Sequence, residues 1–271
     1  MKFSFMSFSC PELNLDEMIT LARTYGYDGI EPRISAQHQH GIELDSSEAF
    51  RKECQQKSQQ SGISICCIAT SCRYADPEIR HEMISDTHKA IDLASDVGAP
   101  RIRVFGGTIP EAITRAAAIG FVVESMRAVA DHARERGVIL CLETHDDWCH
   151  PKQLAQVMQR VNHPSIAVNW DIMHPVRAAK VTMDEAFQTL KPWIEHIHFH
   201  DGIIRASGNV ELTPIGNGEI DHRRAVELLK NHKYSGFMSG EWINWEPYQI
   251  HLPRELSAMK QYAQHVDDAP V

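Results

Sequence analysis

The chain has 271 residues and carries 27 Lys and Arg against 36 Asp and Glu, a formal net charge of −9 with its 16 histidines neutral. This acidic balance argues against a nucleic-acid-binding protein, because the neutralisation of phosphates requires a positive face. With 43% hydrophobic and 23% charged residues, the composition suits a globular protein and excludes disordered and collagen-like chains.

No apolar run reaches the roughly 18 residues of a membrane helix, and the opening residues 1–11 are too short for the apolar region of a signal peptide. We therefore expect no membrane partner. The seven cysteines are odd in number and scattered, and no CxxC pair has a second pair to match. These features predict reduced thiols and a cytoplasmic protein without a structural zinc site.

Short apolar runs that suit strands alternate eight times with longer segments of helical periodicity. The predicted strands cover residues 2–9, 29–32, 63–70, 101–106, 138–144, 166–171, 194–200 and 236–242. The predicted helices cover residues 15–25, 46–61, 78–97, 111–136, 152–161, 183–190, 222–232 and 254–265. Repeated strand-then-helix units indicate a parallel sheet with right-handed crossovers.

Capping signals agree with this division. Residues 108–111 and 182–185 have the pattern of capping boxes that open a helix. Glycines suited to a left-handed helix end precede four of the predicted strands, namely Gly26, Gly62, Gly98 and Gly137. Eight such units close a barrel, and no GxGxxG fingerprint follows the first strand. The sequence therefore predicts a single-domain (β/α)8 barrel, a TIM barrel, over residues 1–271.

Carboxylates stand at three predicted strand ends, where a barrel of this kind carries its chemistry. Glu143, Asp171 and Glu241 end the fifth, sixth and eighth strands. Since side chains at neighbouring strand ends converge, such a cluster of negative charge would be costly without a cation. A divalent metal, Mn²⁺, Mg²⁺, Co²⁺ or Zn²⁺, would resolve that cost.

The seventh strand supplies histidines to the same end of the barrel. His196, His198 and His200 alternate with apolar residues, so all three point to one side of the strand. Only the outer two can reach the mouth, and His198 and His200 are equal candidates for the metal. His174, three residues after Asp171, could bind metal or support a ligand, but we favour a role as a donor to substrate.

Other polar and aromatic residues have two readings each. Arg103 lies inside the fourth strand, and a buried guanidinium needs a carboxylate, which Glu31 or Glu143 could provide. Glu31 and Arg33 either reach the pocket or form a structural ion pair. The indole rings of four tryptophans near strand ends could pack on a sugar, and packing at the rim of the barrel or in a dimer contact is the equal alternative. These residues are Trp148, Trp170, Trp242 and Trp245.

Taken together, six short motifs resemble those of the xylose-isomerase-like barrel superfamily. The similarity is greatest to its sugar phosphate isomerase/epimerase branch, with ketose 3-epimerases, hydroxypyruvate isomerase and inosose dehydratases. The resemblance covers nearly the whole chain. The motifs are GYDGIEPR at 26–33, LETH at 142–145, D-x-x-H at 171–174, HIHFHD at 196–201, PIGNGEID at 214–221 and GEW at 240–242.

The resemblance implies roles for individual residues. It selects His198 over His200 as the metal histidine, with Glu143, Asp171 and Glu241 as the other ligands. It places His174 at a substrate-contacting position, and His200 where family members often carry Lys. The candidate substrate-binding residues are then His174, His200, Arg205, Trp148 and Trp242, although the offset of Arg205 from His198 is one residue longer than in the epimerases.

The implied activity is a metal-dependent isomerase or epimerase of carbohydrate metabolism, with manganese among the candidate metals. Glu143 and Glu241 would remove and return a proton through a metal-bound enediolate. The alternative is a dehydratase or lyase on a cyclitol or keto-sugar, similar to inosose or dehydroshikimate dehydratase, with His174, His200 or His145 as the acid. The partners would be a small-molecule sugar, cyclitol or keto-acid, and the resemblance suggests a homodimer or homotetramer.

Two further alternatives receive less support. A non-catalytic sugar-binding barrel has little need for two convergent glutamates beside a metal site. The superfamily also contains metal-dependent DNA-repair endonucleases, which use histidines near the ends of strands two and three. Here the third strand ends without a histidine, and His38 and His40 after strand two lack the rest of that pattern. Together with the charge of −9, this disfavours a nucleic-acid substrate.

Overall fold

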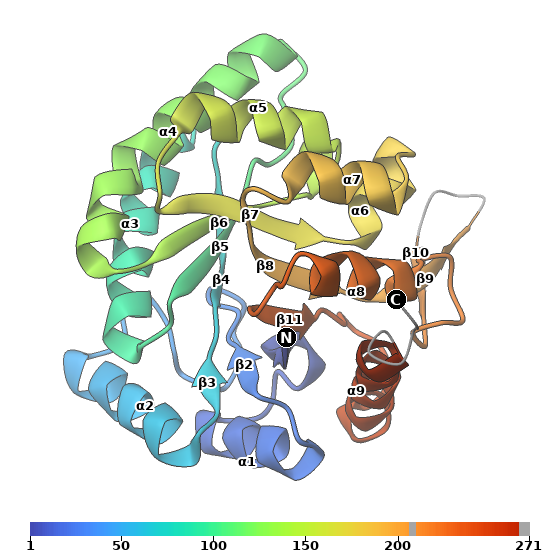
Figure 1. The fold of residues 1–271 in the computed structure, drawn as a ribbon. Coiled ribbons are helices and arrows are strands. Elements are labelled where there is room, and N and C mark those ends of the chain that lie inside the picture. Colours follow the sequence, from blue (N-terminus) through green and yellow to red (C-terminus); the bar gives the residue numbers. More distant parts are fainter. Residues whose placement is uncertain (206–209, 266–271) are drawn as a thin grey trace.

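Parallel strands close an almost complete barrel, and helices surround it (Figure 1). The computed structural model describes residues 1–205 and 210–265. Nine strands form the barrel sheet, and they are β1 (Lys2–Met6), β2 (Gly29–Glu31), β3 (Ser64–Ile65), β4 (Ile68–Arg73), β5 (Arg101–Phe105), β6 (Ile139–Glu143), β7 (Ile166–Asp171), β8 (Ile194–Phe199) and β11 (Phe237–Gly240). Their order, β3-β2-β1-β11-β8-β7-β6-β5-β4, with every pair parallel, confirms the predicted TIM barrel.

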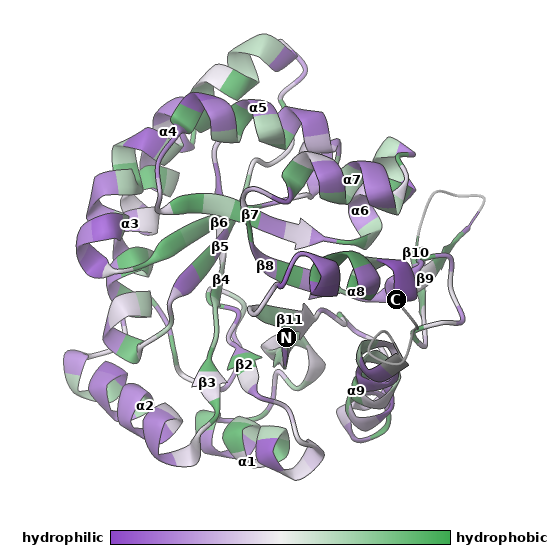
Figure 2. Cartoon of the chain, viewed as in Figure 1, coloured by the Kyte–Doolittle hydropathy of each residue, from purple (hydrophilic) through white to green (hydrophobic). Residues whose placement is uncertain are grey.

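Within the described residues, nine α-helices follow the strands. They are α1 (Leu15–Tyr25), α2 (Glu48–Ser61), α3 (Arg80–Val97), α4 (Arg115–Arg136), α5 (Pro151–Val161), α6 (Met173–Ala179), α7 (Met183–Leu190), α8 (His222–Asn231) and α9 (Tyr248–His265). Figure 2 shows strands that are largely hydrophobic inside helices of mixed character, as expected when each helix buries one face. The described residues contain no helix long and apolar enough to cross a membrane.

The third barrel position is divided between two strands, which corrects the single strand predicted over residues 63–70. β3 pairs with β2, whereas β4 pairs with β5. Pro32, directly after β2, has no N–H with which to continue the ladder. Beyond it, β2 and β4 are joined only through an isolated bridge between Arg33 and Ala69. The barrel is therefore nearly closed at this seam.

Helix boundaries follow their capping residues. The four glycines expected at helix ends, Gly26, Gly62, Gly98 and Gly137, all adopt left-handed conformations. The capping box predicted at residues 108–111 is wrong, because α4 starts at Arg115 and Thr114 accepts its capping hydrogen bond from Ala117. The second predicted box is supported, since Thr182 accepts from the backbone of Glu185. The last helix starts six residues before the predicted residue 254.

Two insertions at the C-terminal ends of strands were not predicted. Helix α6 follows β7 after one residue, and an antiparallel hairpin of β9 (Asp201–Ile204) and β10 (Val210–Thr213) follows β8. The carboxylate of Asp201 accepts hydrogen bonds from the backbone of Gly202, Gly216, Gly218 and Ile220. One buried carboxylate thus fixes the loop that returns from the hairpin.

All seven cysteines are buried as free thiols, as the sequence predicts.

Trp148 packs against the end of β5 and donates from its indole to the carbonyl of Gly107. A side chain at Gly106 would collide with this indole ring. Only glycine at position 106 therefore permits this packing of Trp148.

We predict that Gly106→Ala destabilises the protein by about 1–3 kcal/mol, because Trp148 would have to leave a close-packed position. Urea unfolding measures this cost. Gly120→Ala, inside α4 with open space around the added carbon, is the matched control and is expected to stabilise by about 0.5–1 kcal/mol. Equal unfolding midpoints for the two variants would contradict the packing argument.

Candidate metal centre

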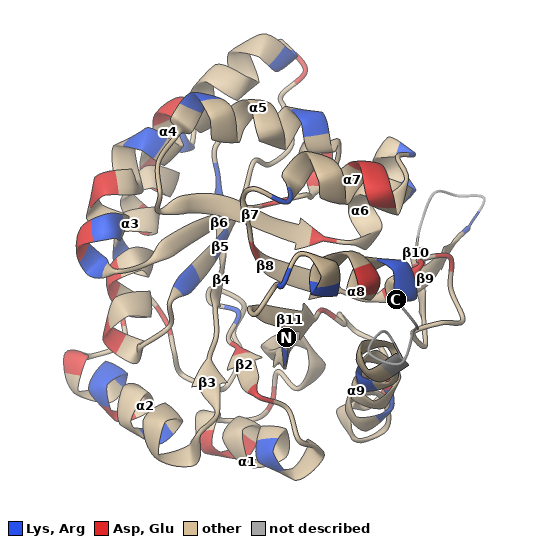
Figure 3. Ribbon diagram, in the orientation of Figure 1, with Lys and Arg blue, Asp and Glu red and all other residues tan. Residues whose placement is uncertain are grey.

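Three carboxylates and one imidazole converge at the C-terminal ends of four neighbouring strands. Glu143 and Asp171 are the last residues of β6 and β7, His198 lies in β8, and Glu241 directly follows β11. The register pairs Asp171 with His198, which itself pairs with Ser239 of β11. One ligand atom from each of the four side chains lies within 4.8 Å of all the others. Figure 3 shows one acidic residue at the tip of β7, where the strand ends in Asp171.

Arg103 in β5 partly balances this negative charge. Its Nε lies 3.3 Å from Oε2 of Glu143, and its Nη2 lies 3.9 Å from Oε1 of Glu241. The guanidinium also donates to the carbonyl of Thr70. The sequence predicts a carboxylate from Glu31 or Glu143 beside this guanidinium, and in the structure the partner is Glu143. One cation beside three buried carboxylates leaves the cluster with excess negative charge.

His198 stands between two sets of carboxylates. Its Nδ1 lies 2.7 Å from Oε1 of Glu143 and 3.5 Å from Oε2 of Glu241, whereas its Nε2 lies 3.1 Å from Oε1 of Glu31. Burial disfavours the imidazolium, but these three carboxylates outweigh burial and hold the pKa of His198 well above its usual value. These carboxylates therefore favour the imidazolium form of His198.

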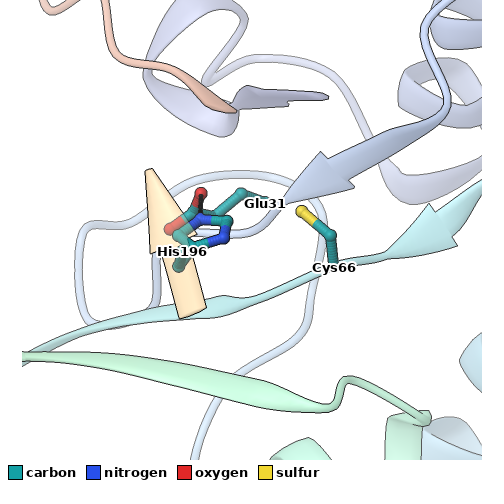
Figure 4. Close-up of side chains that lie close together, drawn as sticks. All are labelled: Glu31, Cys66 and His196. Carbon is teal, nitrogen blue, oxygen red and sulfur yellow. Dashed lines mark hydrogen bonds and ion pairs between the residues drawn. The ribbon is translucent and has the colours of Figure 1, made fainter. Parts of the chain in front are cut away.

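Glu31 joins two histidines beneath the cluster, a role that the sequence analysis did not assign to it. Its Oε2 lies 2.8 Å from Nε2 of His196. Figure 4 shows these two side chains together with the neighbouring Cys66. Burial opposes ionisation of Glu31, yet His196 and His198 hold its pKa well below the usual value. Cys66 donates to the carbonyl of Ile30 and keeps its proton, since burial raises its thiol pKa above the usual value.

The donor set suits a divalent cation. Within the described residues, Oε2 of Glu143 and Oδ2 of Asp171 are buried and accept no well-directed hydrogen bond, although Arg103 and His200 lie 3.3 and 2.9 Å from them. Buried oxygens of this kind are costly unless something binds them. Three carboxylates with one imidazole form a mixed, mainly hard site that Mn²⁺, Mg²⁺, Co²⁺ or Zn²⁺ can occupy. Glu31 would then support His198 from the opposite ring nitrogen.

Further histidines line the outer side of Asp171. Nε2 of His200 lies 2.9 Å and Nε2 of His174 lies 3.7 Å from its Oδ2. Burial lowers the pKa of His174, whereas the charge of Asp171 overcomes burial and raises that of His200. His145 packs edge-on against His174, and its pKa is raised to about 9 because Asp146 and Glu143 outweigh burial.

The other residues expected to bind substrate lie elsewhere. Arg205 forms an exposed ion pair with Glu211 in the β9–β10 hairpin. Trp148 and Trp242 are fully buried, and Trp242 packs against Phe199, which favours the rim-packing alternative for both indoles. The substrate role of these three residues stays a prediction that the structure does not strengthen.

The structure separates the two residues at the end of β2 that the sequence could have paired with each other. Glu31 pairs with histidines and not with Arg33, so the structural ion pair considered for these two residues is absent. His40 donates from Nε2 to the carbonyl of Arg33 and accepts at Nδ1 from Ile42. With both ring nitrogens engaged, His40 has a structural role in place of the metal-binding role that an endonuclease would need.

Comparisons with known proteins agree with this architecture. The family model described as "Xylose isomerase-like TIM barrel" matches residues 19–262. The 3-dehydroshikimate dehydratase of Bacillus anthracis is 22% identical, with 96% of each chain covered. A solved L-ribulose 3-epimerase has a TM-score of 0.81 at 15% identity, covering 98% of this chain and 96% of its own. The IOLI protein, solved with a zinc atom, has a TM-score of 0.81 at 19% identity, with 98% of each chain covered. At these identities, the structural likeness establishes a shared fold.

We predict that Glu31→Gln weakens Mn²⁺ or Zn²⁺ binding by about 10–100-fold, because an amide cannot accept hydrogen bonds from two imidazoles through both of its heteroatoms. Isothermal titration calorimetry on metal-stripped protein measures the change. Glu255→Gln, which alters a buried carboxylate on α9, is the control and should leave metal affinity unchanged. Equal affinities for the Glu31 variant and the wild-type protein would show that Glu31 does not orient His198.

Proposed function

Because this chain belongs to the xylose isomerase-like TIM-barrel family, we propose that it is a divalent-metal-dependent isomerase or epimerase. Its single domain, over residues 1–271, would act on a small hydroxylated carbonyl compound by moving a carbon-bound proton. The observation that carries this proposal is the convergence of three buried carboxylates and one histidine on adjacent strand ends. Such a cluster has little structural value by itself, since unpaired buried charge is costly.

Glu143, Asp171, His198 and Glu241 would hold the metal. A bound divalent cation would polarise a substrate carbonyl and its neighbouring hydroxyl, which makes the proton on the carbon between them more acidic. Asp171 is anchored for this purpose, because its other oxygen, Oδ1, accepts hydrogen bonds from the backbone of Met173 and His174 at the start of α6. The unpredicted helix α6 thus holds one proposed ligand in place.

Glu143 and Glu241 would be the base and acid pair. They come from β6 and from the end of β11, so they approach the centre from different strands of the barrel. Burial opposes ionisation of Glu241, but His198 and Arg103 lower its pKa to about 2, so this side chain is an ionised carboxylate at neutral pH. One glutamate would remove the proton and the other would return it, to the opposite face in an epimerase or to the adjacent carbon in an isomerase.

A dehydratase is the second candidate, and the histidines beside Asp171 favour it. After removal of the same proton, loss of a β-hydroxyl as water requires an acid near the departing oxygen. His200 is suited to this step, because Asp171 favours its protonated form. The full-length similarity to a 3-dehydroshikimate dehydratase supports the same reaction class.

Exchange of substrate protons with deuterium tests the proposal. The metal-loaded protein would be incubated in D₂O with ketoses, hydroxypyruvate, an inosose and 3-dehydroshikimate, and followed by NMR. We expect compounds of one of these chemical classes to exchange a carbon-bound proton for deuterium or to lose water. Glu143→Gln and Glu241→Gln should each slow that reaction by at least about 100-fold.

The metal content of each variant must be measured alongside, so that a lost base is distinguished from a lost ligand. Glu53→Gln, an exposed change on α2, is the control and should keep full activity. Unchanged rates in both glutamate variants, with metal retained, would disprove their assignment as the acid and base.

A further inference from the structure

Arg33 presents an uncompensated positive charge beside the candidate metal centre. It lies just beyond the C-terminal end of β2, the edge of the barrel at which the metal-ligating side chains converge. Its guanidinium donates to the backbone carbonyl of Ile34 and to the hydroxyl of Ser71, which are both neutral. Across the described part of the chain, no carboxylate forms an ion pair with it within 4.0 Å, although its side chain is half-buried.

The surroundings of Arg33 contain charges of both signs. Burial, followed by the like charge of Arg103, lowers the pKa of Arg33 to about 10, whereas Glu241 and Glu43 act in the opposite direction. Arg33 thus lies close enough to Arg103 and Glu241 to interact with both. Glu241 is already shared by Arg103 and His198, so no carboxylate among the described residues serves Arg33 alone.

The position of Arg33 is fixed before any ligand arrives. Its backbone N–H donates to the hydroxyl of Ser7, and its carbonyl accepts from His40. The isolated bridge to Ala69 fixes the same residue against β4. The guanidinium is held as well, by its hydrogen bonds to Ile34 and Ser71. It therefore loses little conformational freedom on binding an anion, which favours affinity and geometric selectivity.

We propose that Arg33 binds a carboxylate of the substrate, so that the substrate is a hydroxy-keto acid and not a neutral ketose. The inference rests on the proposed function and deepens it. A planar guanidinium matches a carboxylate through two parallel hydrogen bonds, and one positive charge balances one negative charge. A phosphate carries more charge and more acceptor oxygens than this single guanidinium satisfies. Arg205, the arginine expected from the sequence, is instead paired with Glu211 in solvent.

Binding of matched probes to the metal-loaded protein tests the proposal by calorimetry. Each carboxylate has a neutral counterpart, hydroxypyruvate with dihydroxyacetone, and 3-dehydroshikimate with its carboxamide. We expect the wild-type protein to bind at least one acid about 10-fold or more tighter than its counterpart. Arg33→Gln should abolish this preference and leave binding of the neutral probe unchanged, whereas Arg33→Lys should retain part of it.

Arg23→Gln removes an equal charge from the exposed surface of α1 and should change neither affinity. Ribulose 5-phosphate and ribulose form a third pair, and a phosphate preference that depends on Arg33 without a carboxylate preference would overturn the proposal. An acid preference that survives Arg33→Gln would also overturn it. Titrating the same probes into protein without metal separates this inference from the proposed function. If the protein proves to bind no metal and still prefers the acids through Arg33, this inference is supported and the proposed function is contradicted.

Discussion

The repulsion among Glu143, Asp171 and Glu241 is the constraint on which the site depends. Parallel strands bring these carboxylates to one edge of the barrel, and burial removes the water that would otherwise screen them. In the metal-free protein, Arg103 and the imidazolium of His198 supply the compensating charge. A divalent cation would allow His198 to bind as a neutral ligand, with its Nε2 hydrogen directed at Glu31.

Polar groups behind and beside the cluster hold it in shape. Glu31 engages His198 from below, the backbone at the start of α6 binds Asp171, and the buried carboxylate of Asp201 fixes the loop after the β9–β10 hairpin. The first two contacts fix the directions of His198 and Asp171 before metal binds, which reduces the reorganisation required on binding. Arg33 is held in the same way, and its open charge would distinguish an acidic substrate from a neutral sugar.

Periodicity predicted most of the fold and the convergence of the three carboxylates, whereas His198 was chosen over His200 by resemblance. Strand β7 and helices α1 and α7 have the predicted boundaries, and carboxylates at the ends of nearby parallel strands converge in a barrel. What periodicity misses is pairing across the barrel. Local patterns do not show that Glu31 pairs with His196 and His198 and not with Arg33. They also do not show that the third barrel position is divided between β3 and β4 beside Pro32. Arg205 was chosen by resemblance, yet its surroundings in the hairpin supply a counter-ion.

Metal content tests the central claim most directly. Protein purified without added metal would be analysed by mass spectrometry and then titrated with Mn²⁺ and Zn²⁺, beside a variant that combines Glu143→Ala with Asp171→Ala. We predict about one divalent ion per chain in the wild-type protein and none in the variant, because two of the four ligands would be missing. A wild-type protein that contains no metal and takes up none on titration would contradict the account.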